Sequence, residues 1–328
     1  MRISVSRFWF LHGPAATLLI SWLLFVGIAS PGQAGVLRLP TIQAPWIQLA
    51  GDPDLRDMTA PNQQPVDFGI WQAADGTWQL WSCIRGTKEP GKTRLFYRWE
   101  GAKLTDPDWK PAGIAMHADP KFGELTGGLQ APFVFKRDGH FEMFYGGWED
   151  ICSATSADGK TFARKLNVDG KATLFRSPGD FAQTRDPMLI RIGDSWHCYY
   201  TAHTGTRGAD FCRTSRDLRN WSEARMVAAG GQSGSGNFSA ECPFVVELDP
   251  GQFYLFRTQR YGTNAQTSVY FSPDPLDFGV NHDEGHFLCK LPVAAPEIIK
   301  YEGQYYIAAL LPSLKGIQIA HLEWKAKN

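Results

Sequence analysis

The sequence predicts an all-β protein folded as a five-bladed β-propeller. Three observations lead to this prediction: a strand–turn–strand unit recurs five times, a proline marks the same point in four of the units, and a second motif recurs in phase with the first. No stretch shows convincing helical spacing, and a repeat of about 50 residues with three or four short strands is typical of a propeller blade. A pair of β-sandwiches, the rival all-β fold, does not explain why the two motifs stay in phase.

Each unit consists of an apolar strand, a glycine-containing turn and an aromatic-rich return strand, which is the pattern of a β-hairpin. The clearest example begins at Thr184 and turns at Gly193-Asp194. The other first strands begin near Val66, Gln130, Glu241 and Ala295. The prolines that mark the units give a period of about 55 residues; they are Pro132, Pro187, Pro243 and Pro296.

A second motif, Ser-x-Asp-x-x-x-aromatic, lies near the end of three units. Ser and Asp side chains at such a position can accept hydrogen bonds from backbone amides in a turn. We expect the aromatic side chain to fill the gap to the neighbouring blade. The three copies contain Ser156, Asp158 and Phe162, then Ser215, Asp217 and Trp221, then Ser272, Asp274 and Phe278.

Residues 1–34 have the features of an export signal. Arg2 and Arg7 precede an apolar run from Ala15 to Ile28, and small residues around Ala34 suit cleavage. The run is shorter than the roughly 20 residues that span a bilayer, so a cleaved signal is favoured over an anchor. We therefore expect an exported protein, secreted or periplasmic, with no stable membrane anchor after signal cleavage.

The remaining chain is long enough for one large domain. We expect a lead-in segment at residues 35–61, with one strand around Trp46 to Leu49, and a propeller at residues 62–328. Hydrophobic residues make up 43% of the sequence, so a sizeable core can be buried. The charges balance, with 33 Lys and Arg against 33 Asp and Glu, and no basic stripe favours a nucleic-acid partner.

The six cysteines show no spacing typical of a metal site. Export would permit disulfides, and Cys198 and Cys212, which flank one hairpin, are the candidate pair. Otherwise the cysteines act as small buried hydrophobes. The polar segment 281–286 contains two histidines, but its context favours a solvated loop. No metal and no cofactor is expected.

Acidic residues occur at the entrances of three first strands: Asp67, Asp186 and Glu241. In a propeller the first strand of each blade lines the central channel, so these entrances converge at one mouth. Gln130 and Ala295 stand at the entrances of the second and fifth units. We interpret the three acids as occupying equivalent positions of three blades.

Converging carboxylates suit cleavage of a glycosidic bond. One acid must donate a proton to the leaving oxygen, and another must attack the anomeric carbon or activate water. Glu241 precedes Cys242-Pro243-Phe244, an apolar setting that would raise the pKa of a carboxyl. Arg185 beside Asp186 would favour the ionised form of that acid.

The Arg185-Asp186-Pro187 and Glu241-Cys242-Pro243 stretches resemble the RDP and ECP motifs of five-bladed propeller glycosidases, glycoside hydrolase families 32 and 43 and their relatives. The Ser-x-Asp-x-x-x-aromatic repeats are similar to theirs too, and the resemblance covers roughly residues 62–325. It implies that Asp67 is the nucleophile or base, Asp186 the stabiliser and Glu241 the acid. The first blade departs from the Asn-Asp-Pro-Asn-Gly motif of the fructan-cleaving branch, since this chain has Pro65-Val66-Asp67-Phe68-Gly69.

That departure argues against sucrose or fructan and leaves arabinosyl, xylosyl and galactosyl substrates open. We expect an oligo- or polysaccharide as the partner. Two alternatives remain: a carbohydrate-binding propeller without catalysis, and a phosphorylase, which needs several Arg, Lys or His at the mouth. His203 follows the third hairpin, and a structural role is favoured for it. The expected substrate-binding residues are Arg185, Gln130, Trp148, Trp71 and Phe68.

Overall fold

The computed structural model describes residues 36–176, 183–205 and 207–327. The predicted export signal therefore lies outside the described residues. In the part of the chain that is described, no helix is long and apolar enough to cross a membrane.

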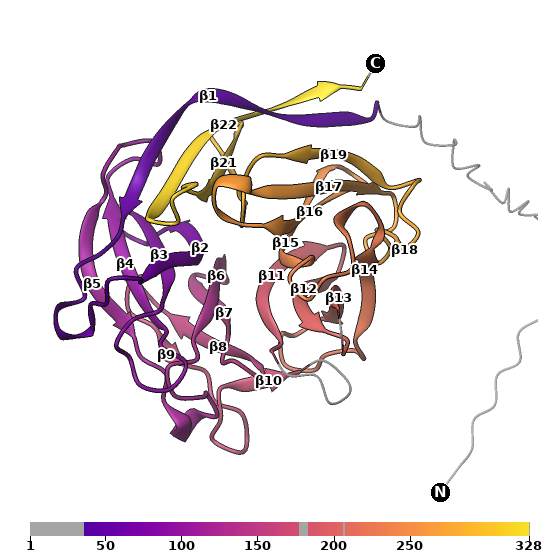
Figure 1. The fold of residues 1–328 in the computed structure, drawn as a ribbon. Coiled ribbons are helices and arrows are strands. Elements are labelled where there is room, and N and C mark those ends of the chain that lie inside the picture. Colours follow the sequence, from indigo (N-terminus) through magenta and orange to yellow (C-terminus); the bar gives the residue numbers. More distant parts are fainter. Residues whose placement is uncertain (1–35, 177–182, 206, 328) are drawn as a thin grey trace, which may run out of the picture. The chain divides into compact units, whose positions relative to one another are not determined.

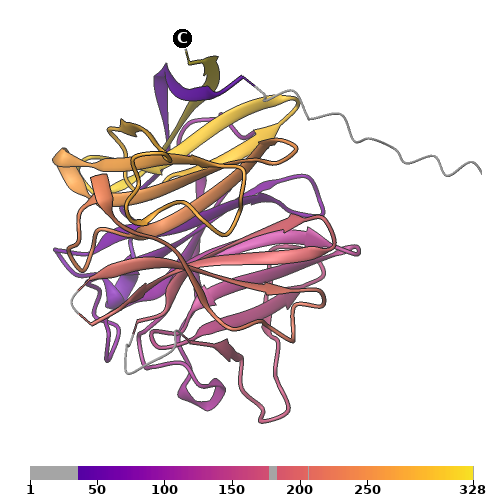
Figure 2. The same ribbon diagram turned by 90° about the vertical axis from the view of Figure 1, so that its right-hand side faces the viewer.

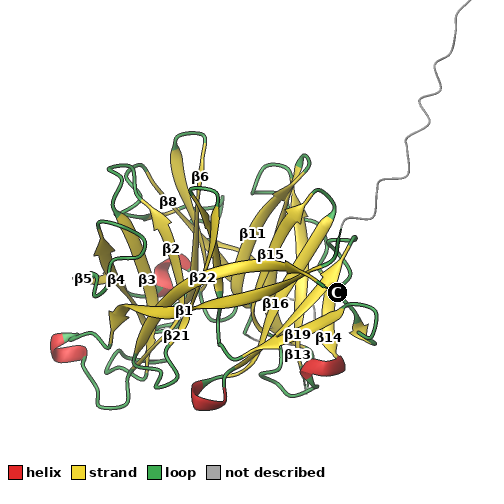
Figure 3. Cartoon of the chain, turned by 90° about the horizontal axis from the view of Figure 1, so that it is seen from above, coloured by secondary structure: helices red, strands yellow, loops and turns green. Residues whose placement is uncertain are grey.

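Five sheets of four or five strands surround a common centre, as the sequence predicts, and all are antiparallel except for one short parallel pair in the third (Figure 1). The innermost strands contact one another around the ring; they are β2 (Gln64–Gln72), β6 (Gln130–Arg137), β11 (Arg185–Ile192), β15 (Glu241–Asp249) and β20 (Glu297–Tyr301). Within the described residues, short 3-10 turns occur only in the connections between strands (Figure 3). These turns are η1 (Arg56–Met58), η2 (Pro120–Phe122), η3 (Gly231–Ser233) and η4 (Gly262–Asn264).

The blades follow the chain in order, each running from its innermost strand outward. The first contains β2 (Gln64–Gln72), β3 (Trp78–Arg85), β4 (Leu95–Gly101) and β5 (Lys110–Met116); the second contains β6 (Gln130–Arg137), β7 (His140–Gly146), β8 (Ile151–Ser156), β9 (Ala163–Arg164) and β10 (Thr173–Phe175). The third contains β11 (Arg185–Ile192), β12 (Ser195–His203), β13 (Gly208–Ser215) and β14 (Arg225–Gly230), joined by β18 (Val280–Asn281); the fourth contains β15 (Glu241–Asp249), β16 (Gln252–Arg260), β17 (Gln266–Ser272) and β19 (Phe287–Leu291). The fifth contains β20 (Glu297–Tyr301), β21 (Gln304–Leu310), β22 (Gly316–Ala326) and β1 (Arg38–Gly51).

The second strand of a blade is buried on both faces because neighbouring blades cover both sides of its sheet. In β3, seven consecutive residues from Trp78 to Ile84 are buried. The close approach of blades also restricts side-chain size. A Cβ added to Gly69 in β2 would lie 2.4 Å from the carbonyl oxygen of Pro132 in the next blade. Glycine at this position therefore lets the first two blades pack.

The ring is closed by the two ends of the described chain. Strand β1 pairs antiparallel with β22, from Arg38 opposite Ala326 to Gly51 opposite Gly316. The indigo β1 lies beside the yellow C-terminal strand in both views (Figures 1 and 2). Most of the segment expected as a lead-in thus forms the outer strand of the fifth blade, and the strand is far longer than the sequence indicated. Its apolar pattern is weak because an outermost strand has only one neighbouring strand and a more open face.

The three Ser-x-Asp turns join neighbouring blades as predicted. Phe162 packs with its ring centroid 5.3 Å from that of Trp81 in the first blade. Trp221 packs against Phe144 of the second blade, and Phe278 against Tyr199 of the third. Each aromatic side chain therefore fills a gap between two blades.

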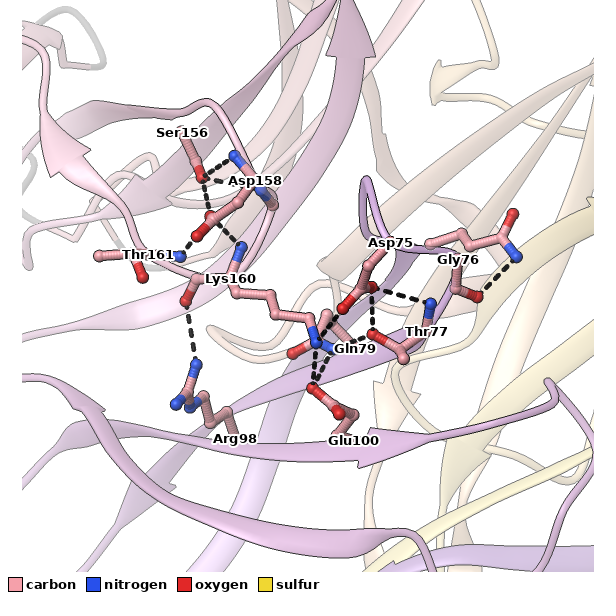
Figure 4. Close-up of polar contacts among 12 residues, drawn as sticks. Asp75, Gly76, Thr77, Gln79, Arg98, Glu100, Ser156, Asp158, Lys160 and Thr161 are labelled. Atoms are coloured by element: carbon pink, nitrogen blue, oxygen red, sulfur yellow. Dashed lines mark hydrogen bonds and ion pairs between the residues drawn. The ribbon is translucent and has the colours of Figure 1, made fainter.

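The first of these turns also carries a charged link to the first blade (Figure 4). Ser156 and Asp158 accept hydrogen bonds from backbone amides of the turn. Lys160, at its tip, reaches Asp75 at 2.6 Å and Glu100 at 2.7 Å. Burial counts against the ionised form of Asp158, but the amide hydrogen bonds outweigh it and lower its pKa to about 2.

The candidate disulfide between Cys198 and Cys212 is absent, and all six cysteines are free thiols. The register explains why. Cys212 lies opposite Tyr199, so its side chain is on the Tyr199 face of the sheet, whereas the neighbouring Cys198 points to the other face. Both thiols are buried within apolar clusters.

Candidate active site

The same backbone feature occurs at the start of all five innermost strands. Each has one non-glycine residue with positive φ, between 40° and 55°, where the pairing with the next strand slips or begins. In four blades the following residue is proline, which is why the prolines mark the repeat. The five residues are Asp67, Ala131, Asp186, Cys242 and Ala295, and all line one small cavity in the channel.

This alignment corrects the sequence interpretation that the three acids occupy equivalent positions. Asp67 and Asp186 are equivalent, but the residue in the same position of the fourth blade is Cys242. Glu241 lies one residue earlier and is equivalent to Arg185 and Gln130. Consecutive residues of a strand point in different directions. Glu241 therefore lines the pocket at the channel mouth, whereas Asp186 lines the small cavity.

A pocket of about 510 Å³ lies at the mouth of the channel. Asp67 lines both this pocket and the small channel cavity. Glu241, Arg185 and Gln130 line the pocket, and Asp186 lines the cavity beneath. The structure therefore brings the three predicted acids to one region of the channel.

Cys242 connects the two aspartates. Its Sγ lies 3.4 Å from Asp67 Oδ1 and 3.8 Å from Asp186 Oδ2, and its backbone amide donates to Asp186 Oδ2 at 3.1 Å. The Tyr261 hydroxyl lies 3.4 Å from the same sulfur. Burial and the three neighbouring acids raise the pKa of the Cys242 thiol, so it stays protonated and can donate to Asp67.

Arg185 connects the third acid to the pair. Its Nη2 donates to Glu241 Oε1, and its Nε lies 3.8 Å from Asp186 Oδ2. Its Nη1 donates to the Gln183 carbonyl at 2.7 Å. The guanidinium is almost fully buried, so its ion pairs are poorly screened by solvent.

The two carboxyls that contact Arg185 are both held toward their neutral forms. Burial raises the pKa of Glu241 to about 7, and the nearby arginine opposes this only in part. Burial, followed by the charge of Asp67, raises the pKa of Asp186. Glu241 is therefore poised to hold a proton near neutral pH, which is the state that a general acid requires.

His203, for which the sequence favours a structural role, contacts Arg185. Arg185 Nη2 lies 3.0 Å from His203 Nε2. Burial, together with the positive charge of Arg185, lowers the pKa of His203 to about 4, so the ring is neutral at pH 7. Because arginine only donates, Nε2 accepts and the proton resides on Nδ1.

Three of the five expected substrate-binding residues line the mouth pocket: Arg185, Gln130 and Trp148. The other two do not. Trp71 is buried, packs against Trp81 and Phe162, and donates from Nε1 to the Gly159 carbonyl at 2.7 Å. Phe68 is buried and lines the lower channel cavity. Both side chains were expected near the mouth, and neither lines the pocket there.

Several pocket residues were missed from the sequence. Cys242 could have been found by aligning the units on their prolines, since it precedes Pro243 as Asp186 precedes Pro187. The others carry no repeated signal because they lie at strand ends and in loops of different lengths. They are Arg85, Arg94, Gln183, Phe238, Gln259, Arg260, Tyr261 and Asn264.

Among the described residues there is no group of three or more His, Cys, Asp or Glu that could hold a metal ion. The segment 281–286 instead contributes Asp283, which is buried and accepts a hydrogen bond from the Gln232 amide at 2.7 Å.

The fold and the site define a class, the five-bladed β-propellers with acidic residues in the channel. No family model matches the chain, and no curated protein matches it in sequence. Solved structures do match. A thermostable family-43 glycoside hydrolase aligns with a TM-score of 0.60 at 17% identity, over 82% of this chain and 94% of the other.

Two further structures lie in the same range. An endo-arabinase from Bacteroides thetaiotaomicron aligns with a TM-score of 0.57 at 15% identity, over 83% of this chain and 98% of the other. A family-32 β-fructofuranosidase variant from Bombyx mori, solved with sucrose, aligns with a TM-score of 0.58 at 18% identity, over 84% of this chain and 62% of the other. The predicted resemblance to propellers of families 32 and 43 is confirmed at the level of the fold.

Proposed function

We propose that the protein is a glycoside hydrolase that cleaves an oligo- or polysaccharide at the mouth of the propeller channel. One observation carries the proposal: Glu241 and Asp67 line a single pocket, and the pKa of Glu241 is raised to about 7 by burial. Hydrolysis of a glycosidic bond needs one protonated and one ionised carboxyl on either side of that bond.

The roles follow from the surroundings of each acid. Glu241 donates its proton to the leaving oxygen, so that the bond breaks without forming a free alkoxide. Asp67 attacks the anomeric carbon or removes a proton from the attacking water. Asp186 lies beneath the pocket and acts as the stabiliser, through its contacts with Cys242 and Arg185. Arg185 holds the Glu241 carboxyl in place and keeps the side chain oriented toward the pocket.

The test is the Glu241→Gln variant on a panel of aryl glycosides and plant or algal polysaccharides. We expect kcat/KM to fall by about 10²- to 10⁴-fold, because general acid catalysis contributes that much. Activity on an aryl glycoside with a very acidic leaving group should fall less, since that group departs without a proton. Near-normal activity on all substrates in a folded variant would remove Glu241 from the acid role. Absence of turnover by the unaltered protein on the whole panel would favour a binding propeller.

A phosphorylase is the second candidate, and the arginines of the pocket favour it. Arg85, Arg94 and Arg260 line the mouth together with Arg185. Such a cluster could hold inorganic phosphate as the attacking group. Turnover measured with and without phosphate separates the two reactions. Turnover that requires phosphate and releases a sugar phosphate would replace the hydrolase.

We also propose that the protein is exported. The charged and apolar pattern of residues 1–34 supports a cleaved signal and a secreted or periplasmic location. N-terminal sequencing of the protein recovered from outside the cytoplasm tests this. The expected mature end lies directly after Ala34, and an uncleaved chain held in a membrane fraction would contradict it.

A further inference from the structure

The mouth pocket has an excess of positive charge. Four arginines line it, Arg85, Arg94, Arg185 and Arg260, against the two carboxyl groups of Asp67 and Glu241. Lys92 adds a cation nearby, with its Nζ 4.8 Å from the ring centroid of Trp148. The chain as a whole is neutral, so the excess belongs to this pocket and is not a property of the whole surface.

Arg185 forms an ion pair with Glu241, but the other three arginines form none within 4.0 Å among the described residues. Neutral groups hold them in place. Arg85 donates from Nε and Nη2 to Gln64 Oε1 at 2.9 and 2.7 Å, and Arg260 donates to Gln266 Oε1. The Arg94 guanidinium lies 5.1 Å from the Trp148 ring centroid.

Neutral partners orient a guanidinium without neutralising it. Arg94 is half-buried; burial and the like charge of Arg185 act to lower its pKa, but Cys83 and Asp67 outweigh them and raise it, so the guanidinium stays charged. A row of oriented cations in a concave site concentrates positive potential there. The fork of the guanidinium matches the paired oxygens of a carboxylate or a sulfate.

A second observation also indicates a ligand at this place. Gln130 lines the pocket with only 3% of its surface exposed, and its Oε1 has no hydrogen-bond partner among the described residues. Buried amides normally have partners, so this group suits contact with a bound molecule. Trp148 lines the same pocket and offers an aromatic side chain to a sugar ring.

We propose that the pocket binds a saccharide that carries an oxyanion, a carboxylate as in a uronic acid or a sulfate ester, through Arg85, Arg94 and Arg260. This inference rests on the proposed action on saccharides. A neutral pentose or hexose would leave the three cations without a counter-charge after the sugar had displaced water from the pocket. Free inorganic phosphate is the other source of the same chemistry, so the experiment includes it.

The experiment measures binding of monosaccharides, which contain no bond to cleave, so that its result is independent of hydrolysis. Galacturonate is compared with galactose, galactose 6-sulfate with galactose, and inorganic phosphate is titrated alone. We expect one of the charged sugars to bind roughly 10- to 100-fold more tightly than its neutral counterpart, as charge-assisted hydrogen bonds do. The preference should shrink as salt is raised, because the site is open to solvent.

Variants test whether the preference for a charged sugar comes from the arginines of the pocket. Arg94→Gln and Arg260→Gln should each reduce the preference for the charged sugar by about tenfold. Arg260 is exposed, so its replacement leaves the packing intact if Arg94→Gln disturbs folding. Arg216→Gln is the matched control, because this exposed arginine lies in the outer turn of the third blade and should keep the full preference.

Equal binding of the charged and neutral sugars would overturn the inference, whether or not the protein hydrolyses a neutral glycoside. Binding of phosphate alone, with phosphate-dependent turnover, would also overturn it and would support the phosphorylase. Preference for a charged sugar without any turnover would keep this inference and reject the hydrolase.

Discussion

The outer turns and the inner strand entrances are both repeated, but in different ways. The outer turns repeat side chains as well as backbone, with Ser, Asp and an aromatic residue in three blades. The inner entrances repeat only the backbone. A positive φ occurs in all five blades, while the side chains are two aspartates, one cysteine and two alanines. Where side chains and backbone are both repeated, as in the outer turns, they serve the fold. Where the backbone is repeated but the side chains vary, as at the inner entrances, they form the candidate site.

Backbone strain is more regular at the inner entrances: each has a non-glycine residue with positive φ, whereas among the three outer turns only that of the third blade has one, Leu218. Positive φ in a residue with a Cβ costs on the order of 1–2 kcal/mol, and here the packed ring holds five such residues. The bulge re-aims one side chain per blade toward the axis. Ala131 and Ala295 keep this conformation with no polar group, so the bulge belongs to the fold and the acids are additions to it.

The largest expected effect comes from changing an acid at an inner entrance. Asp67→Asn should reduce kcat/KM by about 10²- to 10⁴-fold, because the amide can neither attack nor accept a proton. Ala131→Gly, the equivalent position of the second blade, is the control. It should leave kcat/KM unchanged, since glycine adopts positive φ freely. Comparable losses in both variants would mean that the bulge itself, and not its carboxylate, limits turnover.

Replacing an aromatic residue of an outer turn should reduce stability and leave activity unchanged. Phe278 is fully buried between the third and fourth blades. Phe278→Ala should lower the free energy of unfolding by about 3–5 kcal/mol, through lost burial and a cavity. Denaturant titration measures this, and kcat/KM per folded molecule should stay near the original value. A large loss of kcat/KM in the folded fraction would show that the two regions are coupled.

The pH dependence of turnover reports on the entrance of the fourth blade. Burial raises the pKa of Glu241 to about 7, and only the protonated form donates. Activity should therefore be retained below that pH and fall about tenfold per pH unit above it. The same shift makes the folded state hold its proton longer than the unfolded chain does. The contribution of Glu241 to stability is therefore lost as pH rises from about 4.5 through about 7.

Glu241→Gln tests the stability part of this prediction. Between pH 4.5 and 8 the Tm of the unaltered protein should decrease, in part because Glu241 loses its proton. The variant has no carboxyl at this position, so its Tm should decrease less over the same range. A Tm profile with the same slope in both proteins would assign the pH dependence to other buried acids, of which Asp210 is one, since burial raises its pKa to about 7.

The smallest expected effect is the loss of a polar group from an outer turn. Asp217 Oδ1 accepts from the amides of Arg219 and Asn220, at 2.8 Å each. Asp217→Ala should cost about 1 kcal/mol of stability, the usual effect of losing such a cap on backbone amides, and should leave kcat/KM unaltered. Asp217→Asn keeps an acceptor and should recover most of the loss. Thermal unfolding at neutral pH distinguishes the two variants.

Most of the fold could be predicted from the sequence because its signals are local. Hairpin turns such as Asp138-Gly139, the four prolines and the Ser-x-Asp turns each reflect backbone geometry within a few residues. The ring of five blades then follows from counting. The pairing of β1 with β22 depends on residues 265 to 288 positions apart, so no local pattern indicated the full length of β1.

The candidate site was predictable only in part. The residue types Asp67, Asp186, Glu241 and Arg185 stand out because charge at a strand entrance is unusual. The position of Glu241 relative to Asp186 was misjudged by one residue, since a bulge adds a residue that strand periodicity does not reveal.

The sequence by itself determined the number of blades, the turns that join them and the presence of acids near the channel, because these depend on short-range spacing. Only the tertiary structure decided which side chains share the mouth. It moved Trp71 and Phe68 away from that mouth and brought Arg85, Arg94 and Arg260 to it. The reason is that strand ends and loops from separate blades converge only after the ring has closed, and no spacing along the chain encodes that distance.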